Sequence, residues 1–289
     1  MLENEEINAL FYLIEDPDEK VFDSVSTKLI SMGKGILPNL EHLWENTPDE
    51  ALQRRIEMII HKLHFQDLAK EFTDWHKDSP DLLQGALLVS KYMYPDLSHT
   101  RTFQEVERLR RNIWMELNSY LTPMEESAVI SAILFNYYKL QGNSISYDIP
   151  DDFLLPKLIE NKRGNAISTG ILYLILAQML DVPIAAIKIP RQFILAYFAT
   201  EYEYPDPVKK RTEQIQFYID PLNGQVYSQK DVEEYFKRNS RELLPEYFKP
   251  MNTVETIRHL LEELGSCFTK DNNRYKKEDL ITLAKKLDE

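Results

Sequence analysis

The sequence has 289 residues, of which 43% are apolar and 28% are charged, which is enough for one large soluble domain or two moderate ones. Its 34 basic and 47 acidic residues give a formal net charge of −13, and so acidic a surface argues against general nucleic-acid binding. Cys267 is the only cysteine, which excludes a disulfide framework and favours the cytoplasm, and the longest apolar run, residues 171–177, is far shorter than the ~18 residues of a membrane span.

An internal repeat is predicted within residues 1–80. The tripeptide Pro-Asp-Glu at 17–19 recurs at 48–50, and apolar positions and a tryptophan match at the same offset of 31. Each unit is expected to start a helix at Pro-Asp-Glu, to break briefly, and to continue in a second helix that ends in Trp44 or Trp75. This pattern resembles HEAT-type helical pairs, which bury their faces only by stacking.

The chain from Ser79 to Asn161 is predicted to be mainly helical, with a boundary at Ser79-Pro80-Asp81. One helix, Thr102 to Leu121, is expected to place Phe103 and Val106 on a common apolar face. The other expected helices are Leu82 to Tyr92, Pro123 to Tyr138, and Phe153 to Asn161.

A strongly apolar helix is predicted from Ser168 to Leu180, and the character of the chain then changes. Three segments rich in β-branched and aromatic residues are expected to be strands, and a short fourth strand should follow the Asn223-Gly224 turn: residues 183–189, 193–199, 214–219 and 225–228. The charged segment 201–213 is expected to be a loop, with Lys209-Lys210-Arg211 as a solvated basic run. Helices resume at Gln229, at 253–264 and at 276–287.

The segment from Arg163 to Gly224 has the order of a papain-like catalytic core: a helix start, a strand with a polar residue, and a strand that ends in Asp. Its motifs are Arg-Gly-Asn-Ala-Ile-Ser at 163–168, Pro-Arg-Gln-Phe at 190–193 and Ile-Asp-Pro-Leu-Asn-Gly at 219–224. With Gln-Gly-Ala-Leu-Leu at 84–88 and Tyr-Pro-Asp-Leu at 94–97, residues 81–260 resemble the bacterial SirB-type transglutaminase-like proteins. The resemblance implies a papain and transglutaminase fold, in which a Cys at a helix start, a His on a neighbouring strand and an Asp on the next form the site.

Two of those three chemical groups are missing at the matching positions. The nucleophile position falls at or next to Ala166, and Gln192 stands where the family has a histidine. Because glutamine does not exchange a proton near neutral pH, Gln192 is not a general base. Asp220 remains, and we expect its carboxylate to cap N–H groups of the following turn and to hydrogen-bond Gln192.

Four more residues complete the candidate cleft. Ser168 could be a nucleophile, but a serine needs a base, and a hydroxyl in the first turn of the helix is the favoured interpretation. Arg163 could bind an anion beside the helix start, although an ion pair with Asp151 or Asp152 is favoured. Asn165 and Asn223 are candidates for contacting a small ligand.

No metal or cofactor site is predicted. His61 and His64 lie three apart on a helix with His76 nearby, but no clear further ligand accompanies them. Cys267 follows a C-terminal helix and is interpreted as a buried or incidental thiol, since His259 does not share a helical turn with it.

The predicted fold class is α+β and mostly helical. HEAT-like helical repeats would occupy residues 1–80, a transglutaminase-like domain with a small antiparallel sheet residues 81–248, and a helical tail residues 249–289. The predicted function is a catalytically inactive, cytoplasmic protein-interaction or regulatory module whose repeats bind an unidentified protein. The alternatives are a cryptic peptidase, amidase or acyl-transferase, and a small-ligand binder that uses the degenerate cleft. Neither nucleic acid nor membrane is expected as a partner, and the sequence leaves the oligomeric state open.

Overall fold

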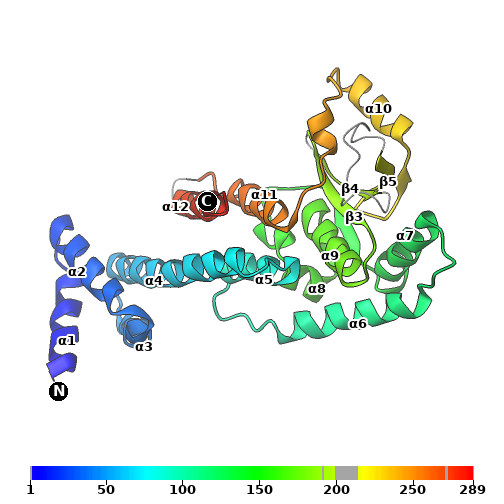
Figure 1. Ribbon diagram of the computed structural model, residues 1–289. Helices are drawn as coiled ribbons and strands as arrows, with labels where there is room; N and C mark the ends of the chain where they lie inside the picture. Colours follow the sequence, from blue (N-terminus) through cyan, green and yellow to red (C-terminus); the bar gives the residue numbers. More distant parts are fainter. Residues whose placement is uncertain (1, 191, 199–213, 271–272, 289) are drawn as a thin grey trace. The chain divides into compact units, whose positions relative to one another are not determined.

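The computed structural model describes residues 2–190, 192–198, 214–270 and 273–288 (Figure 1). The predicted loop at 201–213 and its basic run therefore lie outside the described residues. The chain folds as two compact units that meet at residues 71 and 72, so the predicted core and the predicted tail belong to the same unit. Within the described part of the chain, none of the helices combines the length and the apolar character that crossing a bilayer requires.

The first unit is helical. Its elements follow one another without a strand among the described residues: α1 (Leu2–Ile14), α2 (Glu19–Ser31), the 3-10 turn η1 (Gly33–Ile36), α3 (Leu37–Asn46) and the first part of α4 (Glu50–Lys77). Their apolar faces meet in one cluster around Ile14, Leu29, Leu40 and Ile59, all of which are fully buried.

The predicted helix starts of the repeat are confirmed. The carboxylate of Asp18 accepts a hydrogen bond from the Lys20 amide at 2.9 Å, and that of Asp49 accepts one from the Ala51 amide at 2.7 Å. Each aspartate thus satisfies an amide that the first turn of a helix leaves unpaired.

The predicted break in the second unit of the repeat is wrong. In the first copy of the repeat the chain leaves the helix at Gly33, which has a φ of +70°, and a new helix, α3, begins with Pro38 in its first turn. At an offset of 31, His64 and Ala69 replace these residues, and α4 runs without interruption for 28 residues. Glycine readily adopts the positive φ that ends a helix, and proline suits the first turn of a new one. Histidine and alanine favour neither, so the helix continues through their positions.

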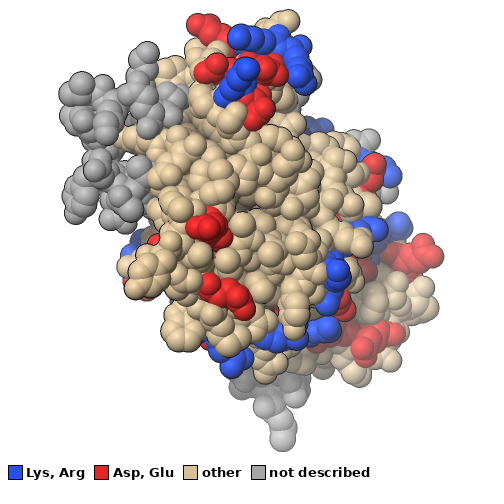
Figure 2. Space-filling model, turned by 90° about the vertical axis from the view of Figure 1, so that its right-hand side faces the viewer, with Lys and Arg blue, Asp and Glu red and all other residues tan. Residues whose placement is uncertain are grey.

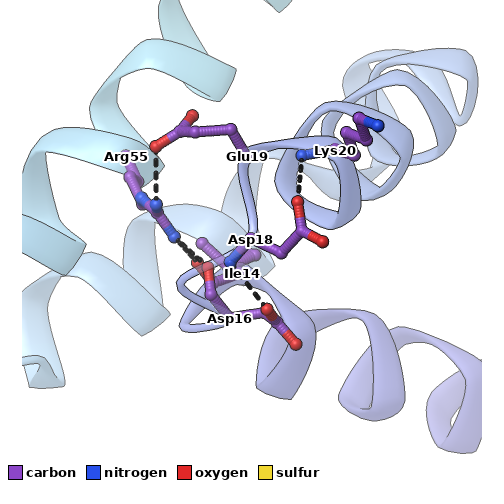
Figure 3. Close-up of polar contacts among 6 residues, drawn as sticks. All are labelled: Ile14, Asp16, Asp18, Glu19, Lys20 and Arg55. Carbon is purple, nitrogen blue, oxygen red and sulfur yellow. Dashed lines mark hydrogen bonds and ion pairs between the residues drawn. The ribbon is translucent and has the colours of Figure 1, made fainter.

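Arg55 of α4 hydrogen-bonds to the turn between α1 and α2 (Figure 3). Its guanidinium donates to the carbonyls of Ile14 at 2.9 Å and Asp16 at 2.6 Å, and it pairs with the Glu19 carboxylate at 3.0 Å. It also lies over the Phe22 ring, 4.7 Å from its centre. A cation at the C-terminal end of α1 complements the partial negative charge of its free carbonyls.

The second unit begins within α4 and contains a helical layer, a sheet and a helical tail. The helices before the sheet are α5 (Leu82–Met93), α6 (Thr100–Glu116), α7 (Pro123–Ser131), η3 (Pro150–Phe153), α8 (Leu155–Asn161) and α9 (Ala166–Met179). Those after it are α10 (Gln229–Arg238), η5 (Pro245–Phe248), α11 (Thr253–Gly265) and α12 (Arg274–Lys286).

Two of the predicted helices differ in detail. In α6 the buried stripe runs through Thr102, Val106, Leu109 and Ile113, and Phe103 is 48% exposed, so its prediction on the apolar face is wrong by one position. Thr102 lies four residues before Val106 and seven before Leu109, so it falls on this stripe, whereas Phe103 lies three before Val106 but six before Leu109 and is turned out of it. The helix predicted from Pro123 changes at Ala132 into a π-helical turn, η2 (Ala132–Tyr137).

The sheet confirms the predicted strands. Four antiparallel strands lie in the order β3 (Ile184–Ile189), β4 (Gln192–Phe198), β5 (Ile215–Ile219) and β6 (Val226–Tyr227). A second, parallel pair joins β1 (Gln141–Asn143) to β2 (Arg163–Asn165), and the sequence pattern did not predict it.

The two faces of the four-stranded sheet carry different helices. Phe193 lies on the face that α9 covers. Its ring is so close to Gly170 of α9 that a Cβ at Gly170 would lie 2.6 Å from it. The opposite face holds a separate apolar cluster in which Ala196 and Tyr218 of the sheet pack with Phe236 of α10. In Figure 1 the labels of α9 and α10 accordingly lie on opposite sides of the strands.

Candidate functional site

The start of α9 is closed by its own cap. Asn165 is fully buried, and its side-chain oxygen accepts hydrogen bonds from the amides of Ile167 at 2.9 Å and Ser168 at 3.1 Å. This confirms the predicted helix start. Ala166, the first residue of the helix, is buried as well. The amides that could lower the pKa of a nucleophile are therefore bound by Asn165.

Ser168 is a hydroxyl of the first turn, as predicted. Its Oγ donates to the carbonyl of Asp152 at 2.6 Å, and the residue is 1% exposed. The hydroxyl is therefore closed off from solvent, and its proton is directed at a main-chain carbonyl rather than at a base. Here it links α9 to η3.

Arg163 follows the favoured interpretation too. One of its guanidinium nitrogens lies 3.9 Å from the Asp152 carboxylate, and half of the side chain is exposed. So long and exposed an ion pair contributes little to stability. Its effect is to balance the charge of Asp152 at the entrance to α9.

Asp220 caps the turn that follows β5. Its Oδ1 accepts from the Leu222 amide at 2.9 Å, and its Oδ2 accepts from the Tyr227 hydroxyl at 3.5 Å. This confirms the predicted capping role. The exposed Asn223 acts similarly, since its side-chain oxygen accepts from the Gln225 amide at 2.8 Å.

Two glycines let this turn approach its neighbours closely. Gly224 has a φ of +75°, and a Cβ there would lie 2.5 Å from the Ser131 side chain at the end of α7. A Cβ on Gly142 of β1 would lie 2.4 Å from the Leu222 carbonyl oxygen. Only glycine fits at either position, because real Cβ contacts do not reach these distances.

Gln192 and Asp220 line one pocket, which opens between α10 and the sheet. Its volume is about 410 Å³. Of the seven residues named for the predicted site, these two line it, whereas Arg163, Asn165, Ala166, Ser168 and Asn223 are not among its described lining residues. Gln192 alternates with Phe193 on β4, so it lies on the face away from α9. The expected hydrogen bond between Gln192 and Asp220 stays a prediction.

His259 of α11 lies against the core, which its distance in sequence does not indicate. Its ring stacks on Phe193, with ring centres 5.6 Å apart and planes 17° from parallel. Burial, and then the charges of Lys188 and Arg258, lower the pKa of His259 to about 4. Its Nδ1 is buried without a hydrogen-bond partner among the described residues. Its spacing of three from Thr256, which is buried, could have placed it on the inner face of α11.

Cys267 does not offer a reactive thiolate. It lies just beyond α11, half-buried, and burial, then Glu263 and Asp148, raise the pKa of its thiol to about 12. At neutral pH the thiol is therefore protonated. Within the described ranges no three His, Cys, Asp or Glu side chains gather into a group that could hold a metal ion.

An exposed apolar corner is the feature that the sequence pattern missed. Trp114, Met115, Tyr120 and Met124, here called the α6–α7 corner, lie within eleven residues and are 64%, 68%, 93% and 50% exposed. Figure 2 shows the side of the molecule on which α7 lies, and Lys, Arg, Asp and Glu are sparse over the middle of that face although the chain carries a net charge of −13.

Comparison with known proteins gives a consistent match. A family model described as the transglutaminase-like superfamily matches residues 100–262. Protein SirB1 of Salmonella typhimurium is 24% identical over 205 residues, which cover 70% of this chain and 72% of that protein. The UPF0162 protein YchA of Escherichia coli K12 is 25% identical over 206 residues, with the same coverage. A UPF0162 protein of Vibrio cholerae is 22% identical over 200 residues, covering 67% of this chain and 68% of its own. No solved structure matches the chain.

Proposed function

Because the chain belongs to the transglutaminase-like superfamily, we propose that it is a member whose fold serves binding rather than catalysis. It would act in the cytoplasm as a protein-interaction or regulatory module.

The observation that carries this proposal is the start of α9. Cysteine chemistry on this fold needs a thiolate at the helix start and an imidazole beside it. The chain instead places the buried Ala166 there, between an asparagine that occupies the helix amides and a serine bonded to a carbonyl. The strand position of the base holds Gln192, and the one thiol, Cys267, is protonated at neutral pH.

The alternative of a cryptic peptidase, amidase or acyl-transferase is tested by a broad hydrolase and acyl-transfer screen of the purified protein. We expect no turnover above that of a heat-denatured sample. Turnover that is lost in Ser168→Ala, and kept in the matched control Ser119→Ala on an exposed turn, would overturn the proposal. Asp220→Ala extends the same test to the remaining acid.

The α6–α7 corner supports a protein partner. Its four aromatic and methionine side chains are exposed within eleven residues of chain, and exposed side chains of these types are enriched at protein interfaces. We therefore place the partner surface at this corner as well as on the predicted helical repeats of the first unit, where Tyr12 is 79% exposed.

Matched substitutions show which of the two surfaces binds the partner. A stoichiometric partner that co-purifies from the native cell should be lost with Trp114→Ala combined with Tyr120→Ala, and retained with Tyr12→Ala. The reverse pattern would assign the partner to the helical repeats. Equal retention by all variants would remove both surfaces from the proposal.

The pocket beside α10 favours a second candidate, a small-ligand binder. Its volume of about 410 Å³ lies within the range of small-molecule sites, and it brings together two of the predicted cleft residues, Gln192 and Asp220. Binding there is compatible with regulation of a protein partner, because the pocket and the α6–α7 corner use different residues. Ligand-dependent thermal shifts that vanish in Gln192→Ala would support it, and shifts that persist unchanged would exclude Gln192 from the site.

A further inference from the structure

A groove in the first unit runs between α1 and α3. Its volume is about 460 Å³. Phe11 and Leu43 are half-buried and give it an apolar floor, and its other described lining residues are exposed: Asn8, Pro38, Asn39 and His42. The groove is therefore open to solvent, which suits a segment of polypeptide that passes through it better than a molecule that must be enclosed.

The two helices that bound the groove hold the same place in the predicted repeat. α1 ends at Ile14, three residues before the Pro-Asp-Glu at 17–19, and α3 ends at Asn46, two residues before the Pro-Asp-Glu at 48–50. In stacked helical repeats, equivalent helices of successive copies together form the extended surface on which partners bind. The groove lies where such a surface is expected.

Two asparagines line the groove, one from each helix. Asn8 and Asn39 are 31 residues apart, which is the offset of the repeat, so each copy contributes one carboxamide. Both residues are exposed, and neither side chain hydrogen-bonds to another residue within the described ranges. Asn46 of α3 differs, because its Nδ2 donates to the His42 carbonyl at 2.7 Å. The two carboxamides of the groove are thus available to a ligand.

A carboxamide matches the main chain of a peptide, because it offers one N–H donor and one C=O acceptor side by side. Along one edge of an extended segment the main-chain groups recur every ~6.8 Å, at a rise of ~3.4 Å per residue. Packed helices lie about 8–10 Å apart, so one segment that crosses both helices can reach Asn8 and Asn39. Phe11 and Leu43 then offer apolar contact to its side chains.

The charge around the groove indicates which segment fits. α1 and α3 together contain five glutamates and neither a lysine nor an arginine. The described lining residues include no carboxylate, whereas Glu41 and Glu45 are exposed on α3, three positions after Pro38 and His42. An uncharged floor beside an acidic rim favours an apolar centre with basic flanks. The same charge repels phosphates and a second copy of a chain with a net charge of −13.

We propose that the groove between α1 and α3 binds an extended, basic segment of a partner protein, whose main chain hydrogen-bonds to Asn8 and Asn39. An apolar side chain of that segment contacts Phe11 and Leu43, and its lysine or arginine flanks lie along the acidic rim. This rests on the proposed function of the first unit as a partner surface and adds the chemistry of the partner.

Selection of peptides on the full-length protein provides the test. A phage library of random dodecapeptides is depleted on the bare support and then selected on the immobilised wild-type protein, at neutral pH and physiological salt. We expect the enriched peptides to combine apolar residues with a net positive charge. Enrichment of acidic peptides would contradict the proposal.

Synthetic forms of one enriched peptide separate its contacts by calorimetric titration. Methylation of its main-chain nitrogens should weaken binding about tenfold, because the hydrogen bonds to the carboxamides are lost. Replacement of its apolar residues by glycine and serine, at unchanged charge, should abolish saturable binding. This second form tests whether attraction to an acidic protein is sufficient by itself.

Matched variants locate the site. Asn8→Ala combined with Asn39→Ala should weaken the enriched peptide about tenfold, whereas Asn112→Ala, the same change in α6, should leave binding unchanged. Alanine favours a helix more than asparagine does, so the double variant should fold. Glu41→Gln combined with Glu45→Gln should lower both the affinity and its dependence on salt.

Three results would overturn the proposal: a selection that enriches no peptide, equal binding to the wild type and the double asparagine variant, or full binding of the glycine–serine form. A wild-type dimer in sedimentation velocity that is lost in the double variant would also overturn it, because a second copy would then fill the groove. The outcome is separable from that for catalysis. Turnover in the hydrolase screen would refute a non-catalytic function and leave the groove standing, and absence of peptide binding, with no turnover, would remove the groove alone.

Discussion

Replacing His259 by leucine perturbs a buried imidazole that the fold holds neutral. The ring stacks on Phe193 of β4, its Nδ1 has no hydrogen-bond partner among the described residues, and Lys188 and Arg258 place positive charge nearby. Protonation would put a further charge into this setting without a counter-charge. Leucine has a similar volume and does not titrate, so it removes the proton site while keeping much of the packing.

The magnitude follows from the lowered pKa. Above pH 6.5 the imidazole is neutral in the folded and the unfolded chain, and it contributes no pH dependence. As the pH falls below 6.5, the unfolded chain takes up a proton that the folded protein does not bind until about pH 4. The free energy of unfolding therefore drops across this window, by about 3 kcal/mol in all, at ~1.4 kcal/mol per pH unit.

Urea unfolding at pH 7.5 and pH 4.5, followed by tryptophan fluorescence, measures the effect, since the buried Trp75 belongs to the same compact unit. The wild-type protein should lose about 2–3 kcal/mol more than His259→Leu between the two pH values. His42→Leu, at an exposed position of α3, is the matched control and should lose as much as the wild type. Equal losses in His259→Leu and the wild type would refute the reasoning.

Four further predictions concern single contacts. Gly224→Ala should lower the free energy of unfolding by at least about 2 kcal/mol because of its φ of +75° and the nearby Ser131 side chain, whereas Gly35→Ala, with open space around its Cβ, should stay near neutral in the same urea assay. Asn165→Ala should cost about 1–2 kcal/mol through the loss of two capped amides, and a smaller loss than that of an exposed cap would contradict its structural role. Arg55→Met should cost about 2 kcal/mol in the first unit, seen by hydrogen exchange of α1 and α2, and Arg55→Lys should recover little of it. Cys267 should react with iodoacetamide at pH 8 far more slowly than free cysteine, by mass spectrometry, because its pKa is raised to about 12; equal rates would refute this.

Local chemistry explains which parts of the fold could be predicted. The starts of α2, α9 and α10 follow from the cap residues Asp18, Asn165 and Ser228, and β3 to β5 follow from β-branched and aromatic runs between turns. The parallel pair of β1 and β2 could not be predicted, since three residues such as Gln141 to Asn143 carry no period. The uninterrupted α4 departs from the predicted repeat because His64 and Ala69 stand at the positions that correspond to Gly33 and Pro38, and matching apolar positions do not show this difference.

The site was predictable in its parts and not in its arrangement. The capping of the Leu222 amide by Asp220 and the position of Ser168 in the first turn of α9, where Asn165 accepts from its amide, depend on neighbours in sequence, so local rules reach them. The direction of Gln192 depends on strand alternation relative to α9, which a motif does not express. His259 meets Phe193 only through the packing of α11, a contact between residues 66 positions apart in the chain.

The turn from Asp220 to Gly224 has a consequence for how such proteins are recognised. Gly224 touches the end of α7, Leu222 touches β1, and Asp220 holds the turn closed, so the motif is required for steric reasons whether or not a reaction takes place. A motif required by shape in this way does not depend on a cysteine at the start of α9, where this chain has Ala166. A match to Asp-Pro-Leu-Asn-Gly therefore indicates the fold of a chain, and an inventory of enzymes compiled from this motif would also count chains without a cysteine at that helix start.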